Sequence, residues 1–144
     1  MIRRSKMLRI LVCCLGGFSS SALSVKVDKE IKERHMEDQV EVNFKPFSLA
    51  ARDFSGYDII MVCPHQKYQV KEYNQKYIKN QLPVYLLPPK IYGSMELDTL
   101  MEDAIDILRL FKQNPNNPIY FPNEDNVMKI RRSLSYRKTI EKQK

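Results

Sequence analysis

The 144 residues, 43% of them hydrophobic, suit one globular domain with a buried core and leave room for a terminal extension. No apolar run approaches the roughly 18 residues of a membrane span, because the longest, residues 8–18, is interrupted by Arg9 and two glycines. The net charge is +7, but its excess lies at the two ends of the chain, so nucleic acid is not expected as a partner.

The first half of the chain predicts a strand, a helix and two more strands. Residues 8–13 are a short apolar run before a glycine-serine stretch, which indicates a buried strand. From residue 20 or 21 apolar and charged residues follow the period of an amphipathic helix capped by serine. Residues 40–46 alternate as in a strand nearer the sheet edge, and residues 57–63 predict a second buried strand stopped by Pro64.

The second half predicts a polar helix over residues 65–80, a fourth strand over 83–88 and a final helix over 94–112. The positions of that last helix expected to face the core are Met95, Leu97, Leu100, Met101, Ala104, Ile105, Leu108 and Phe111. Alternating strands and helices predict an α/β fold of the doubly wound type, with a four-stranded parallel sheet and helices on both faces. Ligands of such sheets bind beyond the carboxyl ends of the strands.

The composition changes after Phe111, where residues 113–118 are rich in asparagine and proline and cannot continue a helix. We therefore expect a domain over residues 1–113 and a basic extension over 114–144 that is flexible or partly helical. On this division, removal of residues 119–144 should leave a folded domain.

The stretch that points to chemistry begins at Cys14, between the first predicted strand and helix. Its glycines let the backbone approach an anion, its serines add hydroxyl donors, and the helix amino terminus attracts negative charge. The same surroundings favour the thiolate of Cys14, which can then attack phosphorus. The predicted phosphate cradle comprises Leu15, Gly16, Gly17, Phe18, Ser19, Ser20 and Ser21.

The cysteines allow three other interpretations. A lone cysteine at a strand end is usually a small buried side chain, which fits Cys13, and no chemistry is assigned to Cys63. A phosphatase of the low-molecular-weight tyrosine type has the same strand, loop and helix, but its Cys-x5-Arg loop needs an arginine where this chain has Ser20. A redox role for Cys13 and Cys14 is disfavoured because they lack Cys-x-x-Cys spacing. Three cysteines without a secretory signal indicate a reducing cytoplasm.

Residues 10–14 with Gly17, Ser19, Ser20 and Ser21 resemble the active-site loop of the IIB components of the lactose/cellobiose group in the bacterial sugar phosphotransferase system. Residues 57–66 are similar to another feature of that family, a buried strand that ends in a Gly-Pro-Gln-like turn. Residues 91–93 resemble its tyrosine-glycine turn before the last helix. The similarity runs in order over about residues 7–112.

The resemblance implies a phosphocarrier with a phosphatase-like P-loop. Cys14 would take a phosphoryl group from a phosphohistidine of the partner IIA protein and pass it to a cellobiose- or lactose-type sugar bound by the membrane permease IIC. It implies no metal or cofactor, and the residues expected at the rim of the site are Pro64, His65, Tyr92 and Gly93. The alternative is a IIB-like regulatory module whose phosphorylation state is read by another protein.

Overall fold

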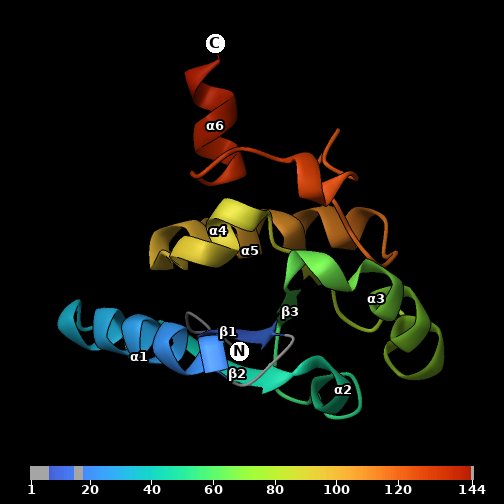
Figure 1. The fold of residues 1–144 in the computed structure, drawn as a ribbon, viewed down its shortest axis with the longest axis horizontal. Coiled ribbons are helices and arrows are strands. Elements are labelled where there is room, and N and C mark those ends of the chain that lie inside the picture. Colours follow the sequence, from blue (N-terminus) through green and yellow to red (C-terminus); the bar gives the residue numbers. More distant parts are fainter. Residues whose placement is uncertain (1–6, 15–17, 144) are drawn as a thin grey trace, which may run out of the picture.

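The structure, a computed structural model, describes residues 7–14 and 18–143, with the backbone alone at positions 14 and 18–21. It contains a sheet of four strands, all parallel, in the order β2-β1-β3-β4 (Figure 1). The strands are β1 (Leu8–Cys14), β2 (Val40–Pro46), β3 (Ile59–Val62) and β4 (Val84–Leu86). The predicted four-stranded parallel sheet is confirmed.

Helices form most of the connections between these strands, and further helices follow β4 to the end of the chain. They are α1 (Phe18–Glu33), α2 (Phe47–Ala50), α3 (Lys67–Tyr73), α4 (Pro89–Ser94), α5 (Leu97–Gln113) and α6 (Tyr136–Lys142). Two 3-10 turns, η1 (Pro64–Gln66) and η3 (Val127–Lys129), and a π-helical turn, η2 (Asn74–Ile78), complete the described elements. None of the helices in the described part of the chain is both long and apolar enough to cross a membrane.

Alternate residues of each strand are buried on opposite faces of the sheet, because successive side chains of a strand point to opposite sides. Ile10, Val12, Ile59 and Met61 pack against side chains of α1, α4 and α5. Leu11, Cys13, Ile60 and Val62 pack against side chains of α2, α3 and η2. Helices therefore cover both faces, as the doubly wound arrangement requires.

The region between β4 and α5 differs from the sequence prediction. Residues 89–94 form the separate helix α4, and its last turn ends at Met95, whose φ of 47° is left-handed and cannot continue a helix. The final helix consequently begins at Leu97 instead of residue 94. The assignment of Ile105 to the core was wrong: its side chain is 41% exposed, whereas Ile107 is fully buried.

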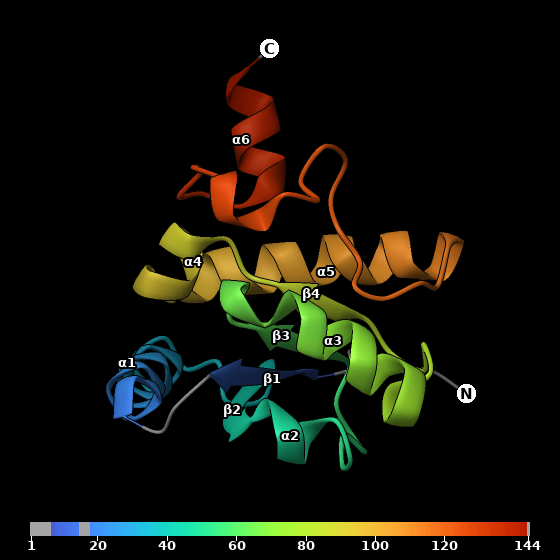
Figure 2. The same ribbon diagram turned by 45° about the vertical axis from the view of Figure 1, so that its right-hand side comes forward.

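The extension after α5 packs against the sheet and α5. The amide of Ile119 donates to the carbonyl of Val84 at 3.1 Å, alongside the edge strand β4. Phe121 joins the core that contains α5, and Val127 joins the core on the opposite face. The chain then reaches α6, and α5 lies between α6 and the sheet (Figures 1 and 2).

Candidate functional site

The carboxyl ends of the parallel strands share one edge of the sheet, where the predicted site residues are expected. The chain leaves β1 at Cys14 towards α1, leaves β3 at Val62 into η1, and leaves β4 at Leu86 towards α4. Figure 2 shows α1 and α4 at the end towards which the β1 arrow points. This edge, which we call the rim, is where ligands of open α/β sheets bind.

Cys14 is the last residue of β1 and pairs in register with Pro46 of β2. Because β1 lies between β2 and β3, Cys14 stands at the centre of the rim. Phe18, Ser19, Ser20 and Ser21 form the start of α1, a helix of 16 residues whose amino terminus begins four positions after Cys14. Leu15, Gly16 and Gly17 lie outside the described residues. The phosphate cradle therefore stays a prediction.

The four residues predicted at the rim come from two short helical segments. Pro64 is buried and His65 is exposed, and both belong to η1. Tyr92 is partly buried and Gly93 is exposed, and both belong to α4. The topology brings η1 and α4 to the same edge as Cys14, while contact between any of these side chains and a phosphate stays a prediction.

Gln66 is a polar residue of η1 that the sequence analysis did not single out. Its side chain is 7% exposed, and its Nε2 donates to Gln69 Oε1 at 2.6 Å. The opposite oxygen, Oε1, is buried without a hydrogen-bond partner among the described residues. A buried amide oxygen without a donor is costly, and its place in η1, two positions after Pro64, makes Gln66 a further rim residue. The proline turn after a buried strand was the signal available in the sequence.

Comparison with models of known protein families matches residues 9–103 to the lactose/cellobiose-specific IIB subunit of the PTS system. The chain belongs to this family. The match runs from the second residue of β1 to the middle of α5 and so covers all four strands except Leu8, together with the rim. None of the curated proteins compared with the chain matches it. The IIB family carries phosphoryl groups in a sugar phosphotransferase system, and residues 104–144 lie beyond the part that the family model matches.

Arg132, in the part beyond the IIB match, anchors the extension to the domain. Its guanidinium donates to Glu124 at 2.8 and 3.0 Å, to Asp103 at 3.0 Å, to Tyr85 Oη at 2.8 Å and to the carbonyl of Leu134 at 2.8 Å. These bonds use every N–H that an arginine possesses. With side chains 5% and 1% exposed, Arg132 and Asp103 form a buried ion pair between the extension and the last residue of the match.

The pKa of the Asp103 carboxyl shows what it costs to bury this ion pair. Burial raises its pKa from 3.8 to about 6, against the opposing effects of Arg132 and of the hydrogen bond from the Tyr136 amide. A carboxyl whose folded pKa is raised contributes stability below its unfolded pKa, and this contribution is lost as the pH rises through its folded pKa. Arg132 is therefore the main group that stabilises the charged form of Asp103.

Replacing Arg132 with methionine is expected to lower the free energy of unfolding by about 3–5 kcal/mol at pH 8, because a buried carboxylate loses its cation. Loss of the cation also raises the pKa of Asp103 further, so the deficit should shrink as the pH falls towards 5 and the carboxyl becomes neutral. Urea unfolding of both proteins across this pH range measures the effect.

The matched control for Arg132 is Arg137, which pairs with Asp106 but is 42% exposed. An exposed pair contributes at most about 1 kcal/mol. Arg137→Met should therefore lower the free energy of unfolding only slightly, without the decrease in the deficit between pH 8 and pH 5 that is expected for Arg132→Met. Equal losses in the two variants would show that the buried ion pair does not hold the extension.

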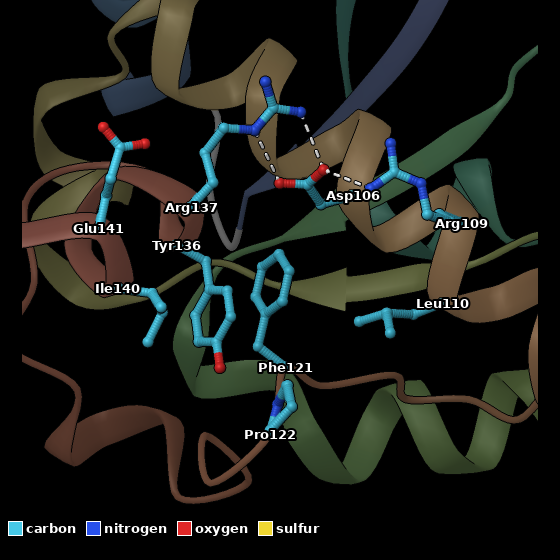
Figure 3. Close-up of a pocket in the computed structure, with 9 residues that line it drawn as sticks. All are labelled: Asp106, Arg109, Leu110, Phe121, Pro122, Tyr136, Arg137, Ile140 and Glu141. Carbon is cyan, nitrogen blue, oxygen red and sulfur yellow. Dashed lines mark hydrogen bonds and ion pairs between the residues drawn. The ribbon is translucent and has the colours of Figure 1, made fainter. Parts of the chain in front are cut away.

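A groove of about 560 Å³ lies between α5 and α6 (Figure 3). The stacked rings of Phe121 and Tyr136, whose centroids are 4.2 Å apart, line one side of it. On the other side Asp106 accepts hydrogen bonds from Arg137 at 2.8 and 3.0 Å and from Arg109 at 3.3 Å. Every lining residue follows the last residue of the IIB match, and three of the four charged ones are paired with one another, so we assign the groove no role in phosphoryl transfer.

Proposed function

We propose that the chain is a phosphocarrier that accepts a phosphoryl group on Cys14 from a phosphohistidine of a IIA protein and passes it to a sugar bound by a membrane IIC permease. Membership of the IIB family supports the phosphocarrier role. The observation that carries the assignment of Cys14 is its place at the carboxyl end of β1, between two neighbouring strands and four residues before the amino terminus of α1. A cytoplasmic location follows from these partners.

The proposed cycle has two balanced transfers. In the first, the Cys14 thiolate attacks phosphorus, the phosphorus–nitrogen bond breaks, and the histidine of the IIA protein leaves with a proton on its ring. In the second, a sugar hydroxyl attacks the same phosphorus, the sulfur–phosphorus bond breaks, and the thiolate is restored as the hydroxyl proton passes to a base or to solvent. Both steps depend mainly on positioning and on stabilisation of phosphoryl charge.

The predicted cradle supplies that stabilisation. Backbone amides of residues 15–21 would donate to the phosphoryl oxygens, aided by the positive end of the α1 dipole. Ser20 occupies the position at which a phosphatase of this kind needs arginine, so rapid transfer to water is not favoured. The phosphocysteine is therefore held until a sugar hydroxyl replaces water as the acceptor, and we propose a cellobiose- or lactose-type β-glycoside as that sugar.

The test is phosphorylation of the purified full chain with phosphoenolpyruvate, the general phosphotransferase proteins and candidate IIA proteins. Digestion with trypsin and mass spectrometry should place one phosphoryl group on the peptide of residues 10–26, which contains Cys13 and Cys14. Repeating the experiment with Cys13→Ala assigns the group to Cys14. A phosphoryl group on Cys63 or on either histidine would overturn the assignment.

A further inference from the structure

The backbone pairing of β1 with β3 places a second cysteine beside Cys14. The two strands run parallel, with Val12 opposite Met61 and Cys13 opposite Val62. The Cys63 amide donates to the Cys13 carbonyl at 3.0 Å, so the strands remain hydrogen-bonded up to this residue. The next pair of positions in the same register is 14 and 63.

Positions 14 and 63 also belong to the same face of the sheet. Val12 and Met61 pack in the core on the α5 side, whereas Cys13 and Val62 pack in the opposite core. Residues two apart in a strand share a face, and Cys63 keeps an extended backbone with φ −63° and ψ 152°. Cys14 and Cys63 therefore follow Val12 and Met61, while Cys13 lies on the other side.

The spacing of adjacent strands suits a bond between these two positions. Neighbouring strands lie about 4.8 Å apart, and the Cα atoms of disulfide-bonded cysteines are usually about 4.4–6.8 Å apart. Cys13 and Cys14 are consecutive in one strand and belong to opposite faces, so their geometry is less favourable. Of the two remaining cysteines, Cys63 is the one whose backbone position fits a bond to Cys14.

We propose that Cys63 is the resolving cysteine of Cys14: on oxidation by a peroxide the two form a reversible disulfide that removes Cys14 from phosphoryl transfer. The consequence for transfer rests on the proposed function of Cys14, whereas formation of the bond does not. Cys14 is the last residue of β1, at the edge of the sheet where small ligands reach open α/β folds, so a small peroxide can reach its thiol. Cys63 is 1% exposed and is thereby shielded from direct oxidation.

The chemistry takes two steps. The Cys14 thiolate attacks one peroxide oxygen, the oxygen–oxygen bond breaks, and a sulfenic acid and hydroxide form. The sulfur of Cys63 then attacks the sulfenic sulfur, the sulfur–oxygen bond breaks, and the departing hydroxide takes the Cys63 proton as water. The two thiols lose two electrons, which reduce one peroxide to water. A dithiol reductant reverses the reaction by thiol–disulfide exchange.

Peptide mapping of the full chain tests the bond without any phosphoryl donor. Reduced protein is treated with hydrogen peroxide, its remaining thiols are alkylated, and it is digested with trypsin without reduction. The Cys13→Ala variant is used because Cys13 and Cys14 share the tryptic peptide of residues 10–26. We expect that peptide to be linked to residues 53–67, which contain Cys63, and the link to disappear on treatment with dithiothreitol.

Phosphoryl acceptance is measured on the same samples. The Cys13→Ala protein should lose phosphoryl acceptance on oxidation and recover most of it with dithiothreitol. Cys63→Ala, checked for folding by circular dichroism, should recover several-fold less because its Cys14 advances to sulfinic acid. Oxidation of Cys14 to sulfinic acid without a link to Cys63, or a link between two copies of residues 10–26, would overturn the proposal. Absence of phosphorylation in the reduced protein with the link present would overturn the proposed function alone.

Discussion

Replacing Cys14 with serine is expected to reduce phosphoryl acceptance to the background of the assay, a loss of at least about 100-fold. The attacking group must be ionised at neutral pH, and a thiol meets this condition far better than a hydroxyl of similar size. Because Cys14 is the last residue of β1 and serine is close to cysteine in size, the substitution should change the fold little. Initial rates of transfer from a phosphorylated IIA protein measure the effect, and circular dichroism checks the fold.

Cys13→Ala is the matched control, since it removes the adjacent sulfur from the same strand. Cys13 is fully buried in the core on the opposite face, so its loss should cost some stability and leave transfer within a few-fold of the natural protein. If the Cys14→Ser protein still accepted phosphoryl groups at a comparable rate, the acceptor would be another residue and the proposed cycle would be wrong.

The sheet could be predicted from sequence because its strands carry strong local signals. Runs such as residues 59–62 are apolar on both sides, which is characteristic of buried parallel strands, and proline or glycine marks their ends. Two helices were not predicted from the sequence. Helix α2 has four residues, too few to show a period, and α4 begins at Pro89, which looks like a break although proline is favoured in the first turn of a helix.

The contact between the extension and the domain was harder to predict because it depends on pairs far apart in sequence. Asp103 lies on the buried face of α5 between Leu100 and Ile107, and a carboxylate there requires a cation. That signal was present, but the sequence does not say which of many basic residues supplies the charge. Arg132, 29 positions later, does so. The stretch after Cys14 is the converse case: its glycines and serines predict a phosphate cradle from local sequence, and that cradle stays a prediction.

These contacts change the result expected from truncation. The sequence favours a domain that is complete by residue 113, and this division stays a prediction. In the structure, however, residues 119–144 supply Ile119, Phe121 and Val127 to the two cores. They also supply Arg132, the cation that compensates the buried charge of Asp103. A chain without them would expose apolar surface on both faces of the sheet and retain an uncompensated carboxylate.

We therefore expect deletion of residues 119–144 to leave a chain that is unfolded or only marginally folded at 25 °C. Loss of a buried phenylalanine costs about 3–5 kcal/mol and loss of one partner of a buried ion pair a similar amount, against a total stability of about 5–15 kcal/mol. Thermal and urea unfolding followed by circular dichroism measure the effect. Deletion of residues 141–144 alone is the control, because positions 141–143 are exposed, and it should unfold like the full chain. A cooperative transition of the longer truncation within about 5 °C of the full chain would show instead that residues 1–118 fold alone, with the extension merely resting on a complete IIB domain.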